Sequence, residues 1–269
     1  LRPPLDASAA RKVEISGARL PENGPLRYHD GVEERLVRRV LARARRGDPQ
    51  SVLATVDDFC YNEHWMMNVG PTKGAVVDRV IDETQPMVML ELGTYVGYST
   101  VRFAARLPPG GTLWSVDMEP AAVESAGLLL ERAGLRERVR LVNGKASDVI
   151  PRLARELGGR KIDVLFIDHS KDSYLPDLLS IERAGLLREG SVVCADNVVF
   201  FQMNEYLRHV RESGLYRSTR TATSTLEYSE QEATPLVDAV EVSVYGGGSG
   251  RSVGGASRRS VASATAYLY

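Results

Sequence analysis

Five short apolar segments, separated by stretches long enough for a helix, constrain the fold of this chain more than any other feature. They lie at residues 87–92, 113–118, 139–142, 162–167 and 192–195. Their hydrophobicity is continuous rather than alternating, which is typical of strands that are covered on both faces. Helix-length spacers between such strands imply right-handed crossover connections. The sequence therefore predicts an α/β fold in which helices cover both faces of a doubly wound, mostly parallel sheet.

The chain on either side of these segments extends the prediction. Residues 219–227 and 239–245 have no helical pattern between them, so we expect a closing antiparallel pair and seven strands in all. Before the first strand, apolar residues recur at helical spacing from Val32 to Ala44. A second helix is expected to begin at Asp48-Pro49 and to run to about residue 61, and residues 73–84 predict a third. We therefore expect extra N-terminal helices beside the sheet.

The two ends of the chain differ in composition from its middle. Residues 1–30 are interrupted by prolines and glycines and show no sustained periodicity. Residues 246–269 are rich in Gly and Ser and contain three Arg but no acidic residue. We therefore predict an irregular N-terminal arm over 1–30, one folded domain over 31–245 and a flexible tail over 246–269.

The balance of charges and the apolar content exclude some classes of protein. The chain has 34 Lys and Arg against 35 Asp and Glu, with a net charge of -1, so we expect no nucleic-acid partner. Cys60 and Cys194 stand in apolar surroundings, and we interpret them as reduced core thiols. No apolar run approaches the roughly 18 to 20 residues of a membrane span. We expect a cytoplasmic monomer, although a chain that begins at Leu1 leaves a removed anchor or targeting segment open.

A glycine-rich turn follows the first predicted strand, where Gly93 and Gly97 are separated by three residues. Such a turn lets a ligand approach the backbone at the place where open α/β sheets bind cofactors, although a plain strand-to-helix turn explains it equally well. Asp117 ends the second strand, and an acid there can accept hydrogen bonds from both hydroxyls of a ribose. The interval from Gly93 to Asp117 suits one β–α–β unit, which favours a nucleoside cofactor over a solvated Asp.

Polar residues follow two further predicted strands. Asp168 comes directly after the fourth apolar segment, and Asp196 and Asn197 come directly after the fifth. Two carboxylates and an amide oxygen at one sheet edge make a hard oxygen site, which suits Mg²⁺. Lys171 lies three residues beyond Asp168, and a metal ion beside it would lower its pKa toward that of a general base. Without that context, Lys171 is interpreted as an ordinary surface lysine.

Four motifs together resemble the catechol O-methyltransferase family. They are Ile-Asp-His-Ser-Lys-Asp-Ser-Tyr-Leu-Pro-Asp at 167–177, Ala-Asp-Asn at 195–197, Leu-Glu-Leu-Gly-Thr-Tyr-Val-Gly-Tyr-Ser at 90–99 and Trp-Met-Met-Asn-Val-Gly at 65–70. The resemblance runs from about Gly31 to Gly246. It implies a Rossmann-like methyltransferase fold, S-adenosylmethionine as methyl donor, and Mg²⁺. The reaction it implies is transfer of the methyl group to one hydroxyl of a small-molecule catechol.

The resemblance also implies roles for individual residues. Asp168, Asp196 and Asn197 match the metal ligands. Lys171 matches the general base, and Glu227 matches the residue that hydrogen-bonds the second catechol hydroxyl. Cofactor contacts are implied for Met67, Val69, Gly93, Tyr95, Ser99, Asp117, Met118, Ala146, Ser147, Asp168 and His169. Asp117 stands where the vertebrate members have Glu, so the ribose contact is expected with a shorter arm.

The expected substrate pocket departs from the family in two places. Ser170 stands where the family has a tryptophan beside the catechol ring, and Phe201 stands where it has a proline. Trp65, the other aromatic wall, is present. The identity of the substrate is therefore open, while the metal, base and cofactor positions are all kept.

Three alternatives follow from these departures and from the motifs taken singly. A related cation-dependent O-methyltransferase could act on a larger vicinal diol, such as a flavonoid or a caffeoyl thioester, for which Ser170 leaves room. A relative of reduced activity could act through protein partners, but loss of metal or base residues would mark it, and none is lost. A regulatory nucleoside-binding module would not need the three metal ligands and the base together.

Overall fold

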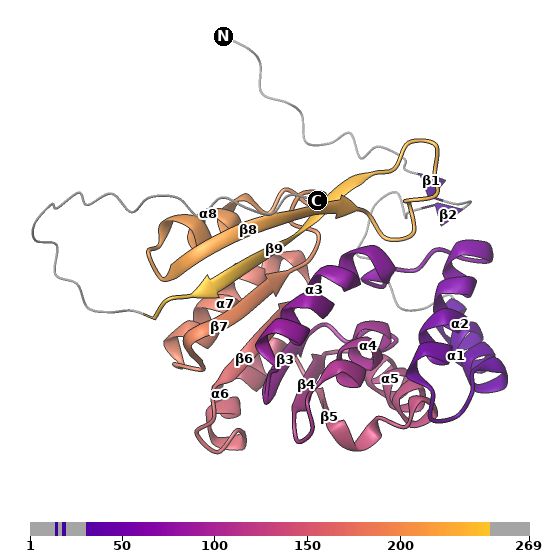
Figure 1. The fold of residues 1–269 in the computed structure, drawn as a ribbon, viewed down its shortest axis with the longest axis horizontal. Helices are drawn as coiled ribbons and strands as arrows, with labels where there is room; N and C mark the ends of the chain where they lie inside the picture. Colours follow the sequence, from indigo (N-terminus) through magenta and orange to yellow (C-terminus); the bar gives the residue numbers. More distant parts are fainter. Residues whose placement is uncertain (1–13, 16–17, 20–30, 248–269) are drawn as a thin grey trace, which may run out of the picture.

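A seven-stranded sheet with the strand order β5-β4-β3-β6-β7-β9-β8 lies at the centre of the protein (Figure 1). The computed structural model describes residues 14–15, 18–19 and 31–247. The strands of the sheet are β3 (Val88–Leu92), β4 (Thr112–Asp117), β5 (Val139–Asn143), β6 (Ile162–Ile167), β7 (Leu187–Ala195), β8 (Tyr216–Thr225) and β9 (Val237–Tyr245). Pairs among β3 to β7 are parallel, whereas β9 is antiparallel to both β7 and β8. This topology confirms the predicted doubly wound α/β fold.

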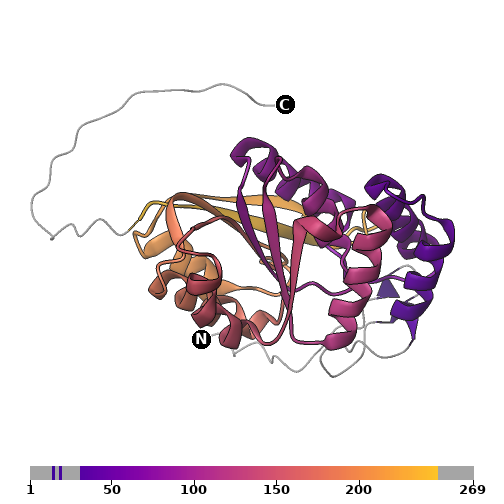
Figure 2. The ribbon, with the colours of Figure 1, turned by 90° about the horizontal axis from the view of Figure 1, so that it is seen from below.

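Helices cover both faces of the sheet. In the described residues they are α1 (Val32–Arg43), α2 (Pro49–Asn62), α3 (Gly70–Thr84), α4 (Tyr98–Arg106), α5 (Pro120–Ala133), α6 (Ala146–Glu156), α7 (Tyr174–Arg183) and α8 (Asn204–Glu212), with short 3₁₀ turns η1 (Arg136–Arg138) and η2 (Lys171–Ser173). α3, α4 and α5 share one core with the sheet, and α6, α7 and α8 share another. α1 and α2 pack against α4 and α5 at the end of the molecule away from α8 (Figures 1 and 2). The extra N-terminal helices are therefore confirmed.

The hydrophobic core is divided in two by the sheet. Along β3, Met89 belongs to the core beneath α3 to α5, while Val88 and Leu90 belong to the core beneath α6 to α8. This alternation follows from strand geometry, because successive side chains point to opposite faces. Apart from Glu91, both sets of side chains are apolar, since both faces are covered by helices, and the strand therefore has the nearly continuous hydrophobicity seen in the sequence.

Two strands, β7 and β8, begin three or more residues before their predicted bounds. β7 begins at Leu187 rather than at residue 192, because the polar residues Arg188 and Glu189 continue the strand. β8 begins at Tyr216 and ends at Thr225, so Glu227 lies in the loop between β8 and β9 rather than inside a strand. Edge and end segments of a sheet are held by backbone hydrogen bonds with their side chains in solvent, so an apolar pattern does not reveal them.

The segments outside the sheet test only part of the sequence predictions. β1 (Glu14–Ile15) and β2 (Ala18–Arg19) form a separate antiparallel pair. The rest of the predicted arm and residues 248–269 of the predicted tail lie outside the described residues, so the three-part division stays a prediction. Within the described part of the chain, none of the helices is long and apolar enough to cross a membrane. Cys60 and Cys194 are buried and unbridged, as predicted.

The carboxyl ends of β3, β4, β6 and β7 meet at one edge of the sheet. β3 pairs with both β4 and β6, so the strand order reverses beside it, at the position where open α/β sheets bind ligands. The two connections approach each other closely there, because a Cβ at Gly93 would overlap the backbone of Asp168. Gly93 also has a φ of +99°, a conformation that side chains rarely adopt. The backbone at this edge therefore requires glycine.

Candidate active site

The turn after β3 is held by the carboxylate of Asp117 at the end of β4. One oxygen of Asp117 accepts the backbone N–H groups of Thr94 and Tyr95, both at 2.9 Å, and the other accepts that of Glu119 at 3.0 Å. Tyr95 has a φ of 47°, and Gly97 has a φ of 91°. The shape of this turn thus depends on Asp117, whether or not Asp117 also contacts a ligand.

The other residues predicted to contact a cofactor come from several elements around this turn. Ser99 is buried in the first turn of α4, Ala146 and Ser147 begin α6, and Met118 follows β4 with 54% of its surface exposed. Met67 and Val69 lie in the segment before α3 and pack in the same core as Tyr95. Several of the residues predicted to contact the cofactor therefore lie together at the carboxyl edge of the sheet. They are Gly93, Asp117, Met118 and Asp168.

Lys171 stands between two of the predicted metal ligands. Its Nζ donates to Asp168 Oδ1 at 2.9 Å, to Asn197 Oδ1 at 2.8 Å and to the hydroxyl of Tyr174 at 2.6 Å. Lys171 belongs to η2, which directly follows the end of β6, and Asn197 follows β7. The ammonium therefore occupies a position between two oxygen donors that also suits a metal cation.

Asp196, the third predicted ligand, is completely buried. Its Oδ1 accepts the backbone N–H of Asn197 at 2.8 Å and pairs with Lys73 Nζ at 2.9 Å, whereas its Oδ2 has no hydrogen-bond partner. Burial raises the pKa of Asp196 above its ordinary value. An unpartnered carboxylate oxygen inside a protein is costly, so a bound cation is a fitting partner for it.

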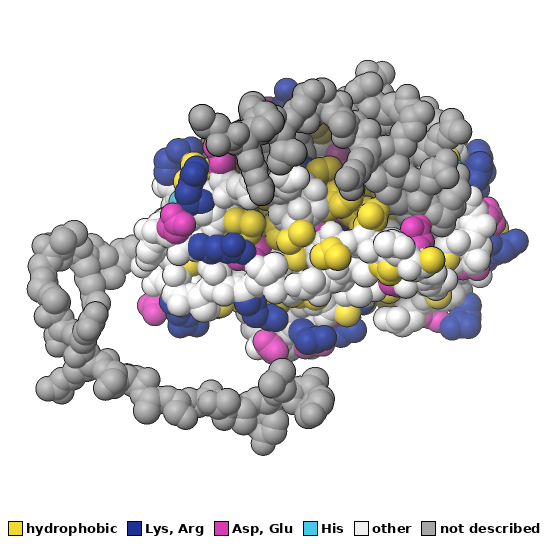
Figure 3. Space-filling view, turned by 90° about the horizontal axis from the view of Figure 1, so that it is seen from above, with side chains coloured by type: hydrophobic (Ala, Val, Ile, Leu, Met, Phe, Trp, Pro, Cys, Tyr) yellow, Lys and Arg dark blue, Asp and Glu magenta, His cyan; other side chains and the backbone are white. Residues whose placement is uncertain are grey.

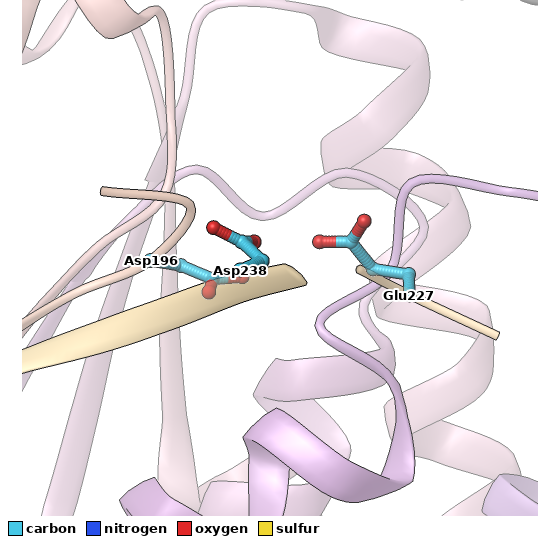
Figure 4. A group of neighbouring side chains, drawn as sticks. All are labelled: Asp196, Glu227 and Asp238. Atoms are coloured by element: carbon cyan, nitrogen blue, oxygen red, sulfur yellow. The ribbon is translucent and has the colours of Figure 1, made fainter. Parts of the chain in front are cut away.

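Asp196 also belongs to a second group of acids, whose convergence on one lysine the sequence did not predict. Asp196, Glu227 and Asp238 converge on one space, with Glu227 on the other side from Asp196 and Asp238 (Figure 4). Lys73 Nζ contacts Asp196 Oδ1 at 2.9 Å, Asp238 Oδ2 at 2.7 Å and also Glu227 Oε1. Burial alone lowers the pKa of Lys73, but the three carboxylates outweigh it and raise that pKa well above its ordinary value. We name these four residues the Lys73 cluster.

Asn197 connects the two groups. Its Nδ2 donates to Glu227 Oε1 at 2.7 Å and to Asp238 Oδ2 at 2.8 Å, while its Oδ1 accepts from Lys171. The φ of Asn197 is 57°, in the left-handed region that Asn tolerates better than most residues. The amide is therefore oriented with its nitrogen toward the carboxylates and its oxygen toward Lys171.

The residues predicted to line the substrate pocket lie near these ligands. Trp65 is 9% exposed, and its Nε1 donates to the carbonyl oxygen of Glu227 at 2.9 Å. Phe201 is 44% exposed, and its ring centroid lies 5.4 Å from Lys171 Nζ. Ser170 is exposed at the start of η2. The three side chains thus come from three separate loops.

The side chain of His169 contacts Asp177 and Tyr174. Its Nε2 lies 2.8 Å from Asp177 Oδ2, and its ring stacks on Tyr174 at 5.4 Å between centroids. Tyr174 also accepts from Lys171. His169 therefore supports the position of Lys171 through Tyr174, while its backbone N lies beside Gly93, another residue predicted to contact the cofactor.

Apolar surface borders this edge of the molecule. Val199 and Phe201 follow β7, Val237 begins β9, and each has more than a third of its surface exposed: 41%, 44% and 60%. On the face seen from above, hydrophobic side chains gather across the middle of the molecule, and Lys and Arg side chains lie mainly around them (Figure 3). The polar site is thus set beside apolar side chains that an aromatic molecule could contact.

A solved structure shares the fold of this protein. The O-methyltransferase TomG from Streptomyces achromogenes, solved in complex with SAM, superposes with a TM-score of 0.61. The two chains are 21% identical, and the alignment covers 82% of this chain and 100% of TomG. Together with the strand order, this likeness defines a Rossmann-like methyltransferase fold.

Sequence comparison then gives the family. The family model described as O-methyltransferase matches residues 46–209. Catechol O-methyltransferase from Bos taurus is 43% identical over 81% of this chain and 78% of its own length. Catechol O-methyltransferase B from Danio rerio is 44% identical over 79% of this chain and 78% of its own length. The chain is therefore a methyltransferase that belongs to the O-methyltransferase family and, within it, to the catechol O-methyltransferase family, as its motifs predict.

Proposed function

We propose that this protein transfers the methyl group of S-adenosylmethionine to one hydroxyl of a catechol in a reaction that depends on Mg²⁺. One observation carries the proposal: Asp168, Asp196 and Asn197 offer oxygen ligands beside the amine of Lys171, whose Nζ lies 2.9 Å from Asp168 Oδ1 and 2.8 Å from Asn197 Oδ1. The names of the similar proteins from Bos taurus and Danio rerio support the same reaction.

The donor set fits a hard divalent cation. Carboxylate and amide oxygens are the ligands that Mg²⁺ prefers, and Asp196 keeps one buried oxygen without a partner. Lys171 already bridges Asp168 and Asn197 with a positive charge, as a metal ion would. Asp168, Asp196 and Asn197 would therefore hold the ion, and its charge would stabilise an ionised catechol oxygen.

Lys171 is the proposed general base. A phenol with a pKa of about 10 is mostly protonated at neutral pH, so a base near the hydroxyl raises the fraction of the reactive anion. A cation bound by Asp168 and Asn197 would take the two oxygens that Lys171 now contacts and would repel a positively charged amine beside them. The hydroxyl of Tyr174, 2.6 Å from Nζ, gives the amine a remaining partner when it releases the two ligand oxygens.

Glu227 and Trp65 are proposed to position the substrate. Glu227 Oε1 already accepts from Asn197 and Lys73, so Oε2 is the oxygen with free capacity for the second catechol hydroxyl. Trp65 is fixed by its hydrogen bond to the carbonyl of Glu227, and its ring would then form one wall for the catechol. Positioning of this kind accounts for a large part of the rate when two substrates must meet in line.

S-adenosylmethionine, which supplies a methyl group on a positively charged sulfur, is proposed to bind along the turn after β3. Asp117 accepts three backbone N–H groups, and a carboxylate has about four lone-pair positions. Asp117 thus has capacity for about one ribose hydroxyl rather than two while the turn keeps this shape. Asp has a shorter side chain than Glu, which is consistent with a carboxylate that holds the loop.

The proposal is tested by product analysis with and without metal. Metal-stripped protein is incubated with S-adenosylmethionine and a catechol, a monophenol or a bulkier vicinal diol, in Mg²⁺ or in chelator, and products are identified by mass spectrometry. We expect methylated vicinal diols only in Mg²⁺ and poor use of the monophenol. Equal turnover of the catechol in chelator would contradict the mechanism.

A second candidate substrate class is a larger vicinal diol. Ser170 is exposed and small where the family has a tryptophan, and Phe201 is 44% exposed beside Lys171. Both features leave one side of the proposed site open to a substituent on the ring. The same panel separates the two candidates, because a preference for bulkier diols in kcat/KM favours the larger substrate class.

A further inference from the structure

The Lys73 cluster has the geometry of a cation site that is already filled by the chain itself. Ligand oxygens of Asp196, Glu227 and Asp238 all lie within 4.8 Å of one another, and all three residues are buried. Lys73 is 1% exposed, and its Nζ is within hydrogen-bond distance of all three, at 2.9 Å from Asp196 Oδ1 and 2.7 Å from Asp238 Oδ2. Its ammonium therefore stands where a metal ion would meet the three carboxylates, which Figure 4 shows without Lys73.

We propose that Lys73 is a positioning residue that acts as a built-in cation: it occupies the three-carboxylate site permanently and so confines the exchangeable divalent cation to Asp168, Asp196 and Asn197. The inference rests on the proposed function only for the destination of the exchangeable ion. The other part of the inference, that Lys73 excludes a second ion from the cluster, rests on the contacts of Lys73 alone.

The fold explains why this cation does not exchange. Lys73 lies in the first turn of α3, which begins at Gly70, and its side chain runs through the core to the loop between β8 and β9. A tethered ammonium cannot be diluted away or chelated, in contrast to a metal ion held by the same oxygens. It also carries one charge rather than two, and donates hydrogen bonds instead of demanding a full octahedral shell.

The cluster determines which atoms of the predicted ligands remain for a metal. Asp196 directs Oδ1 to Lys73 and leaves Oδ2 unpartnered. Asn197 directs Nδ2 to Glu227 and Asp238 and leaves Oδ1 on the side of Asp168. Each ligand thus uses one polar atom toward the Lys73 cluster and keeps the other, an oxygen, for the opposite side. Residues behind metal ligands commonly orient them in this way.

The formal charges agree with one divalent cation. Four carboxylates meet at this edge, those of the Lys73 cluster and Asp168, and two ammonium groups, Lys73 and Lys171, face them. Before a metal binds, with Lys171 protonated, four negative charges less two positive charges leave two negative charges, which favour a divalent ion. Removal of the Lys73 charge leaves three, and three buried carboxylates then lack a cation.

The experiment counts Mn²⁺ ions bound per chain, by equilibrium dialysis and by electron paramagnetic resonance, in the unmodified protein, in Lys73→Ala and in the conservative variant Lys73→Arg. We expect Lys73→Ala to bind about one more ion than the unmodified chain, because Mn²⁺ accepts the same carboxylate oxygens. Lys73→Arg keeps a cation in the cluster and should match the unmodified chain. No additional ion in Lys73→Ala overturns the inference.

The count also separates this inference from the proposed function. An unmodified chain that binds no Mn²⁺ contradicts the proposed metal dependence, whereas the difference between Lys73→Ala and the unmodified chain still decides the role of Lys73. If Lys73→Ala does not fold in chelator, its thermal unfolding is measured with Mn²⁺ added, which should rescue it.

A double variant covers the case in which even Mn²⁺ does not rescue folding. Lys73→Ala/Asp238→Asn lacks one of the three carboxylates, so it should fold better than Lys73→Ala and bind no additional ion. If the double variant is no more stable than Lys73→Ala, the carboxylates of the cluster do not need a cation, and the inference is wrong.

Discussion

Lys171 contacts the same oxygens that the proposed metal needs, so a bound metal would displace its amine from them. Its ammonium contacts Asp168, Asn197 and Tyr174, so cation binding and release of the amine are linked. Lys171→Met removes the base and keeps an unbranched side chain that is one atom shorter. We expect methyl transfer to fall by about 10²- to 10⁴-fold, the usual size of a general-base contribution, with S-adenosylmethionine affinity by calorimetry within a few-fold. Asp117→Ala should show the reverse pattern. Loss of cofactor binding in Lys171→Met would exclude its role as the base.

The wall of the proposed substrate pocket differs from the family at Ser170. Ser170 is exposed, and a tryptophan there would add apolar surface beside the catechol. Burial of that surface is worth about 1 to 2 kcal/mol at about 25 cal/mol per Å². We expect Ser170→Trp to lower KM for a small catechol and to leave kcat within a few-fold, because ring packing is similar in ground and transition states.

Steady-state kinetics on two tryptophan variants check this prediction. Ser213→Trp is the matched control, because Ser213 is exposed at the end of α8 and lies outside the residues of the site. It should leave KM unchanged. A KM for small catechols that is unchanged or higher in Ser170→Trp means that Ser170 does not face the ring.

Part of the site could be predicted at the level of residues. Asp168, Asp196 and Asn197 could be placed together because they follow apolar strands, and parallel strands end at one edge; their role as metal ligands stays a prediction. Lys73 carries no such signal, since a lysine in a helical pattern is ordinarily in solvent. Asp238 follows the exposed Val237 at the start of β9, so its burial depends on the partner strands and not on its neighbours in sequence.

At the scale of elements, the close approach of α4 and α5 depends on Gly97. This residue precedes α4 with a φ of +91°, and a Cβ there would lie 2.7 Å from Ala126 Cα in α5. Gly97→Ala should therefore cost both backbone strain and overpacking, about 2 to 4 kcal/mol of unfolding free energy. Gly158→Ala is the matched control, because Gly158 has a φ of +61° with no atom within 4 Å and should cost about 1 kcal/mol.

Denaturant unfolding of the two variants measures the difference. Both variants carry the strain of a positive φ, although the φ of Gly97 is larger, so the excess loss in Gly97→Ala reports mainly on helix packing. Equal losses in the two variants would show that α5 moves aside at no cost.

The elements themselves were predictable where burial dictates their sequence. β3 and β6 are buried along their whole length, and their apolar runs predict their bounds to within one residue. β8 is an edge strand with polar side chains that are half-buried or exposed, and its start at Tyr216 has no apolar signal. The pattern of hydrophobic residues therefore predicts the centre of the sheet and misses the ends that only backbone hydrogen bonds define.

At the scale of the whole molecule, a buried acid links the sheet to the helices above it. Glu91 in β3 is fully buried, and its Oε2 accepts from Ser115 in β4 at 2.6 Å and from Thr100 in α4 at 2.7 Å. Its Oε1 has no partner. Burial raises the pKa of Glu91 to about 7, although the hydroxyls oppose this. The protonation of one side chain thus bears on the stability of the entire domain.

The sign of its pH dependence follows from the raised pKa. The folded chain binds this proton more tightly than the unfolded chain, in which the carboxyl titrates near its ordinary value of 4.5. The stabilisation is therefore complete below that ordinary value and is lost as pH rises through about 7, by about 2 to 3 kcal/mol between pH 5 and pH 8.

Glu91→Gln cannot titrate. We expect the unfolding free energy of Glu91→Gln, relative to the unmodified protein, to increase by this amount from pH 5 to pH 8. Any constant cost of the amide cancels in that comparison, as do other titrating groups that both proteins share. Urea unfolding at the two pH values decides it, since a difference that does not change with pH would mean that Glu91 is ionised throughout.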